Sequence, residues 1–142
     1  MAHIFVVDDD PGIRTVLRSA LEEQGHAVSE AGDGLTALER LRTSPWPLVV
    51  LLDLKMPYLD GAGVLGTLAG DGALAQRHRY VLMTASAQTL PLALGTLLVC
   101  LGVPLVQKPF DLEVVLDIVA HLAQEAPAAR RARNGIGTAA VS

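Results

Sequence analysis

Short apolar runs alternate along this chain with stretches whose apolar residues recur at helical spacing. The run Leu48–Leu52 is apolar at every position, which is typical of a strand buried on both faces of a parallel sheet. Five alternations of strand and helix predict an α/β fold, in which right-handed crossovers place helices on both faces of the sheet. The expected strands are His3–Val7, His26–Ala31, Leu48–Leu52, Arg79–Met83 and Val103–Gln107.

The intervening stretches carry the start and stop signals of helices. Pro11 is a natural first-turn residue, and Gly25 stops the helix that follows it. Asp33 and Asp60 are expected to cap the second and third helices, and glycines dilute the third. The fourth helix is expected at roughly Leu90–Leu101, and the fifth from Asp111.

Composition indicates one domain followed by a short tail. With 142 residues, 51% of them hydrophobic, the chain can bury a core as a single domain, expected over residues 1–125. Residues 126–142 are rich in Ala, Gly and Arg without periodicity, so we expect a flexible C-terminal tail or linker. Residues 1–125 carry a net charge of −7 and the tail carries +3, so we do not expect nucleic acid as a partner of this chain alone.

Two features bear on the compartment. The single Cys100 cannot form an internal disulfide, and the N-terminus lacks the basic region of a signal peptide, so a cytoplasmic location is expected. The charge-free stretch from Gln88 to Gln107 is long enough to be scored as a membrane span. Pro91 and Pro104, with the glycines between them, favour a helix followed by a strand instead, so we predict no membrane segment.

Polar residues follow four of the five expected strands. Asp8 and Asp9 follow the first, Asp53 the third, Thr84 the fourth and Lys108 the fifth. In open α/β sheets ligands bind outside the carboxyl ends of the strands, at the switch point of the strand order. The order 2-1-3-4-5 would bring the three aspartates together there. A simpler interpretation of the acidic residues before Pro11 is capping of the first helix.

Three carboxylates in one pocket repel each other unless a cation lies among them. Oxygen ligands of this kind suit Mg²⁺, which binds through few carboxylates, waters and a phosphate oxygen. The pattern therefore predicts phosphoryl chemistry, with Asp53 as a carboxylate nucleophile and Lys108 offsetting charge on the transferring oxygens. Thr84 could donate its hydroxyl to a further oxygen, and a cis Lys108–Pro109 bond would direct the lysine into the pocket.

The chain closely resembles the response-regulator receiver domain of bacterial two-component signalling, with a CheY-like, flavodoxin-like fold. The resemblance spans about Ala2 to Gln124 and rests on VVDDDPGIR, LLDLKMPYLDG, MTAS and QKPF, in that order. It implies that Asp8 and Asp9 hold Mg²⁺ and that Asp53 accepts a phosphoryl group from a sensor histidine kinase or phosphotransfer protein. It also implies that Thr84 is the switch hydroxyl, that Lys108 binds a phosphoryl oxygen, and that Lys55 lends its backbone carbonyl to the metal.

One departure from the family pattern concerns output. Three residues before Lys108 the family usually has Tyr or Phe, whereas this chain has Leu105. An alternative function is therefore a receiver fold used as a constitutive interaction module. A third class, a phosphohydrolase of the haloacid-dehalogenase type, needs a second Asp two residues after Asp53, where this chain has Lys55. The domain is thus expected to be a phosphoacceptor rather than a dedicated enzyme.

The fourth helix carries more apolar residues than one buried face can hold. Only about a third of the positions of such a helix can face the sheet. Some of its leucines and Val99 must therefore point outward, and exposed patches of this kind are usually covered by another chain. We expect a homodimer through the fourth helix, fifth strand and fifth helix, which form the usual output face of the family.

Overall fold

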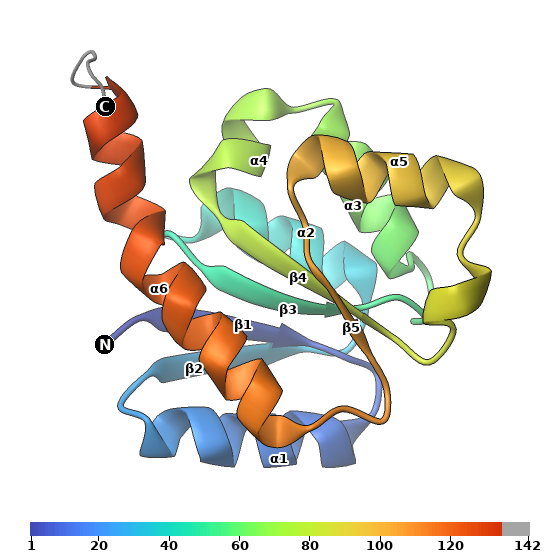
Figure 1. Cartoon of the computed structure of the whole chain (residues 1–142), viewed down its shortest axis with the longest axis horizontal. Coiled ribbons are helices and arrows are strands. Elements are labelled where there is room, and N and C mark those ends of the chain that lie inside the picture. Colours follow the sequence, from blue (N-terminus) through green and yellow to red (C-terminus); the bar gives the residue numbers. More distant parts are fainter. Residues whose placement is uncertain (135–142) are drawn as a thin grey trace.

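The computed structural model describes residues 1–134, and the side chains of residues 1–124, as a parallel sheet between two layers of helices (Figure 1). The strand order is β2-β1-β3-β4-β5, and every pairing is parallel, so the predicted fold class and topology are confirmed. The strands are β1 (His3–Val7), β2 (Ala27–Ala31), β3 (Val49–Asp53), β4 (Arg79–Thr84) and β5 (Leu105–Gln107).

Helices cover both faces of the sheet, and each face has its own apolar core. On one face α1 and α6 pack over Ile4, Val6 and Leu51, and on the other α2, α3 and α5 pack over the alternate residues of the same strands (Figure 1). Strand residues alternate between faces, which is why the central strands are apolar throughout. The helices are α1 (Pro11–Glu23), α2 (Gly34–Thr43), α3 (Gly61–Ala69), α4 (Gly72–Arg77), α5 (Leu92–Leu101) and α6 (Leu112–Asn134), with a short 3₁₀ turn η1 (Ala87–Thr89).

Several strand boundaries differ from the expected ones, and two of the differences concern candidate site residues. Asp53 and Thr84 are the last residues of β3 and β4 rather than the first residues after them. Each residue still pairs with the adjacent strand: Asp53 lies opposite Met83 of β4, and Thr84 lies opposite Gln107 of β5. Both side chains are therefore held by the sheet and not by a loop. At their other ends β2, β3 and β5 begin one or two residues later than predicted.

One helix was not expected from the sequence. A six-residue helix, α4, lies between α3 and β4, where the sequence analysis predicts no separate element. Gly70 ends α3, and the Asp71 side chain then accepts a hydrogen bond from the Leu74 backbone N–H at 3.1 Å, which caps a new helical turn. Leu74 is buried in the core, so α4 is stabilised by packing as well as by its cap.

The last helix extends beyond residue 125. α6 continues to Asn134, through residues that the sequence analysis assigned to a flexible tail. The stretch after residue 125 lacks the apolar spacing that marked the earlier turns, so the sequence did not indicate where this helix ends. The rest of the expected tail, residues 135–142, lies outside the described residues, so the division into domain and tail stays a prediction.

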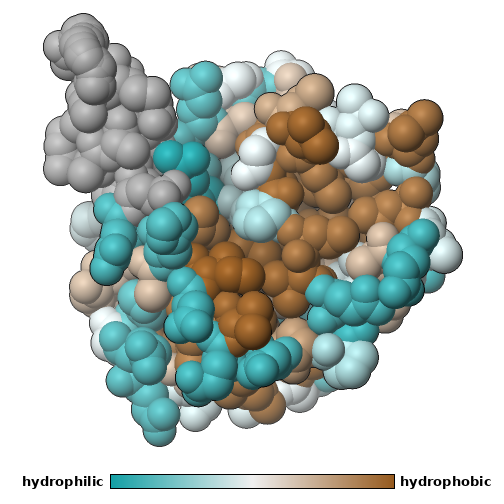
Figure 2. All heavy atoms as spheres, viewed as in Figure 1, coloured by the Kyte–Doolittle hydropathy of each residue, from teal (hydrophilic) through white to brown (hydrophobic). Residues whose placement is uncertain are grey.

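The uncharged stretch from Gln88 to Gln107 divides into η1, α5 and β5, as the proline and glycine positions favoured. None of the described helices combines the length and the apolar character needed to cross a bilayer. On α5, Leu94 and Leu98 face the core, whereas Leu92 and Val99 are 87% and 82% exposed. Figure 2 shows apolar side chains gathered over α5 and β5, as predicted for the outward residues of this helix.

Candidate functional site

Three aspartates meet at the carboxyl ends of the two central strands. Asp8 and Asp9 follow β1, and Asp53 ends the neighbouring β3. Each offers a carboxylate oxygen within 4.8 Å of the other two. Asp8 and Asp53 are 0% and 6% exposed, whereas Asp9 is exposed, so the cluster has a buried floor and an open side. The predicted convergence of these residues is confirmed.

The adjacent Asp10 has a different role. Its side chain accepts hydrogen bonds from the Gly12 and Ile13 backbone N–H groups, and so caps α1. The Asp10 backbone N–H donates to Asp8 Oδ1 at 2.9 Å. The capping interpretation is therefore right for Asp10, while Asp8 turns into the sheet edge.

The Lys108 ammonium lies between the two buried carboxylates. Its Nζ is 2.7 Å from Asp8 Oδ2 and 3.1 Å from Asp53 Oδ1. Lys108 follows β5, its backbone N–H donates to the Thr84 carbonyl at 2.8 Å, and the Lys108–Pro109 bond is cis. The lysine thus reaches the central strands from the edge of the sheet.

These contacts change the acid–base properties of both partners. Burial, with the negative charge of Asp8 adding to it, raises the pKa of Asp53 from 3.8 to about 6, although Lys108 opposes the shift. Burial lowers the pKa of the Lys108 ammonium, but hydrogen bonds to Asp8 and Asp53 outweigh it and raise the pKa above the ordinary value. At neutral pH one ammonium therefore faces three carboxylates, and the cluster has an excess of negative charge.

The remaining predicted residues lie around this cluster. Thr84 is buried at the end of β4, next to β3, and its Oγ1 accepts a hydrogen bond from the Ser86 N–H at 3.0 Å. Its own hydroxyl proton forms no hydrogen bond among the described residues, so the hydroxyl can donate to a ligand. Lys55 is exposed in the loop after β3, two residues beyond Asp53. A role for its backbone carbonyl in metal binding stays a prediction.

The sequence analysis did not identify Arg14 and Glu30, which hold the backbone at Asp8 in place. Arg14 Nη1 donates to the Asp8 carbonyl at 2.6 Å, and its Nε pairs with Glu30 Oε1 at 2.9 Å. The guanidinium thereby ties the end of β1 to β2. A charged residue on the first turn of an exposed helix is an ordinary surface residue in sequence, so nothing marked this contact in advance.

Gly61 was also missed. A Cβ at this position would lie 2.5 Å from the Asp53 carbonyl oxygen, so only glycine lets α3 begin so close to the end of β3. The Gly61 N–H donates to the Leu54 carbonyl at 2.7 Å. A glycine directly after the Asp60 cap was the available signal, but glycine is common at such positions.

The donor set fits a hard divalent cation. The three carboxylates supply oxygen ligands, one side of the cluster is open, and their charge exceeds that of the single ammonium. Mg²⁺ binds through one or two carboxylates together with waters and phosphate oxygens, which this partly open cluster can accommodate. Histidine and cysteine ligands, which would favour softer metals, are absent from the cluster among the described residues.

Comparisons with known proteins agree with this geometry. A family model described as the response regulator receiver domain matches residues 4–120. The chain is 33% identical over 109 residues to the transcriptional regulatory protein CseB of Streptomyces coelicolor, covering 77% of this chain and 44% of CseB. It is 32% identical over 116 residues to sporulation initiation phosphotransferase F of Bacillus subtilis, covering 82% of this chain and 89% of that protein.

The same relationship is seen among solved structures. The Francisella response regulator 1452 receiver domain matches with a TM-score of 0.75 and 25% sequence identity, covering 88% of this chain and 98% of that one. The chain thus spans a receiver domain almost completely, but less than half the length of CseB. From the acidic cluster, the sheet order and these matches together, the chain belongs to the response regulator receiver domain family of two-component signalling.

Proposed function

We propose that this receiver accepts a phosphoryl group on Asp53 from a sensor histidine kinase or a phosphotransfer protein. The observation that carries the proposal is the Asp53 carboxylate, held at a strand end 3.1 Å from the Lys108 ammonium and beside Asp8 and Asp9. An Asp53 oxygen would form the new bond to phosphorus as the bond from phosphorus to the donor breaks, and the donor would leave with the electron pair.

The surrounding residues have distinct roles in this proposal. Lys108 would pair with one oxygen of the transferring group, and Thr84 would donate its hydroxyl to another. Asp8, Asp9 and Asp53, with the Lys55 carbonyl, would hold Mg²⁺. The bound ion would neutralise charge on the phosphoryl oxygens. The domain would act on its own phosphorylation and dephosphorylation, without a separate substrate, and its work with a kinase implies a cytoplasmic location.

Labelling tests the assignment. The purified chain with acetyl phosphate and Mg²⁺ should incorporate phosphate, and Asp53→Asn should abolish incorporation, because an amide is not a carboxylate nucleophile. Asp60→Asn is the matched control: Asp60 is an exposed helix cap, and its loss should leave labelling unchanged. Chelation of Mg²⁺ should also abolish labelling. Persistent labelling of Asp53→Asn would disprove the proposal.

A second candidate function, a constitutive interaction module, is favoured by the output face. Leu105, at the position usually held by an aromatic ring, is 37% exposed, and Leu92 and Val99 expose apolar surface on the adjoining α5. We propose a homodimer through α5, β5 and α6 that depends only weakly on phosphorylation, since burial of this surface would drive it.

Sedimentation with and without beryllofluoride tests the dimer. Val99→Glu should give a monomer, whereas Leu35→Glu, at a 57% exposed position on α2, should not. Leu98 is unsuitable for this test because it is buried. A wild-type monomer at tens of micromolar in both states would rule out the dimer without affecting the phosphoacceptor proposal.

A further inference from the structure

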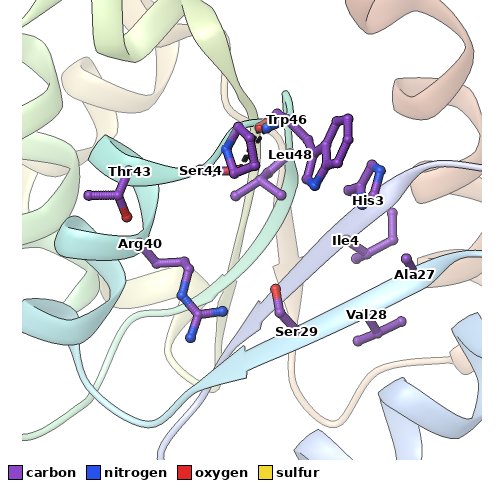
Figure 3. A pocket seen from close by; sticks show the side chains of 11 residues that line it. His3, Ile4, Ala27, Val28, Ser29, Arg40, Thr43, Ser44, Trp46 and Leu48 are labelled. Atoms are coloured by element: carbon purple, nitrogen blue, oxygen red, sulfur yellow. Dashed lines mark hydrogen bonds between the residues drawn. The ribbon is translucent and has the colours of Figure 1, made fainter.

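A pocket of about 400 Å³ lies at the opposite end of the sheet from the acidic cluster. Figure 3 shows the side chains that line it. It is lined by the first residues of β1 and β2, by the last turns of α2 and by the loop that leads into β3. Because it lies at the amino-terminal ends of the strands, the proposed phosphorylation does not involve it. Its lining residues include His3, Ser29, Arg40, Ser44 and Trp46.

Trp46 forms a fixed aromatic wall of this pocket. Its ring stacks in parallel on the His3 imidazole, with the ring centroids 4.7 Å apart (Figure 3). Ser44 fixes the backbone: its Oγ donates to the Trp46 carbonyl at 2.7 Å and accepts from the Trp46 N–H at 3.1 Å. Trp46 is nevertheless 52% exposed. A large apolar ring is thus held in place without being buried, so a ligand that packs on it would lose little conformational entropy in doing so.

Arg40 supplies a positive charge to the same pocket. Its side chain reaches from α2 toward Ser29 of β2 (Figure 3), and its guanidinium carbon lies 5.6 Å from the centroid of the Phe5 ring. No carboxylate among the described residues forms an ion pair with Arg40, and none of the lining residues is acidic. In a chain of net charge −4, this guanidinium thus has no carboxylate counter-ion among the residues whose side chains the structure describes.

We propose that this pocket binds a planar aromatic anion, whose ring packs on Trp46 and whose anionic group pairs with Arg40. An aromatic surface favours a flat ring, and a guanidinium forms paired hydrogen bonds with carboxylate or phosphate. A volume of about 400 Å³ is within the range of small-molecule sites. Nucleoside monophosphates and aromatic carboxylic acids share this chemistry, and the experiment distinguishes them. The inference does not depend on the proposed function.

The chain carries its own reporter, because Trp46 is its single tryptophan. The indole N–H signal of the ¹⁵N-labelled full chain is followed by NMR during titration with GMP or with 2-naphthoate. Guanosine and 2-naphthamide are the neutral counterparts. At least one anion should give a saturable shift, and its neutral counterpart should bind about tenfold more weakly or worse, because it lacks the charge-assisted contact. The anion that binds identifies the ligand class.

Arg40→Gln should weaken anion binding to the level of the neutral counterpart. Arg42→Gln is the matched control: it removes the same charge from the same helix, at a residue that does not line this pocket. Trp46→Leu, followed through the backbone amide of Ser29, should weaken the binding of each anion that the wild type binds. The NMR spectrum of each variant reports whether it is folded. The proposal is overturned if neither anion gives a saturable shift by about 10 mM, if the neutral compounds bind equally well, or if the two arginine variants behave alike.

Discussion

Asp53→Asn should stabilise the metal-free protein while removing the proposed phosphoacceptor. The pKa of Asp53 rises from 3.8 to about 6 on folding, mainly because the carboxylate is buried and lies beside Asp8. Each tenfold change in proton affinity corresponds to about 1.4 kcal/mol, so keeping Asp53 ionised at pH 8 costs the fold about 3 kcal/mol. Asparagine is neutral and nearly the same shape, so the variant should recover most of that energy.

The pH dependence distinguishes this explanation from a general packing effect. Because the folded-state pKa is raised, the native protein binds the proton more tightly than the unfolded chain does. The wild type therefore loses stability as pH rises from 3.8 to about 6, and the loss is complete above that pH. The advantage of Asp53→Asn should fall from about 3 kcal/mol at pH 8 to about half of that at pH 5.

Urea denaturation in the presence of a chelator, at pH 8 and pH 5, measures the free energies of unfolding. Asp60→Asn is the control, since asparagine caps a helix as well as aspartate does, and it should change stability by less than about 0.5 kcal/mol. Adding Mg²⁺ should stabilise the wild type more than Asp53→Asn, because the variant replaces an anionic carboxylate with a neutral amide, a weaker ligand for the ion. An Asp53→Asn protein no more stable than the wild type at pH 8, or an advantage independent of pH, would refute the electrostatic reasoning.

Two further substitutions test the contacts around the site. Lys108→Met leaves two buried carboxylates without their ammonium, so it should lower the free energy of unfolding by about 3 kcal/mol at pH 8 in the presence of a chelator. Mg²⁺ should restore part of this loss. An unchanged denaturation midpoint would contradict the pairing. Gly61→Ala should cost about 1–3 kcal/mol, since its Cβ would meet the Asp53 carbonyl, whereas Gly66→Ala in the open middle of α3 should stabilise by about 0.5–1 kcal/mol; denaturation curves of both variants measure the contrast.

The sequence by itself indicated the α/β fold and placed the polar residues of the candidate site at one edge of the sheet. Each central strand is a continuous apolar run that can only be buried on both faces, and this favours a parallel sheet. Because parallel strands end at one edge, the polar residue at the end of each run was enough to bring Asp53, Thr84 and Lys108 together. That deduction needed the order of the chain and no side-chain geometry.

The sequence did not show which residues are buried in segments whose successive residues have the same polarity. α5 is apolar almost all round, so its spacing could not distinguish buried Leu98 from exposed Val99. The three consecutive aspartates are the same residue type, yet each lies in a different environment: Asp8 is buried against Lys108, Asp9 is exposed, and Asp10 caps α1. Which aspartate takes which of these environments depends on the path of the backbone after β1.

Only the tertiary structure decided the contacts between residues distant in the chain. The pairing of Arg14 with Glu30, the approach of Gly61 to Asp53 and the pocket between Trp46 and Arg40 each join separate elements. The raised pKa of Asp53 has the same origin, since it follows from burial and from the charge of Asp8 on a neighbouring strand. Periodicity reports which side of one element is apolar, whereas distances and electrostatic energies depend on how several elements pack together.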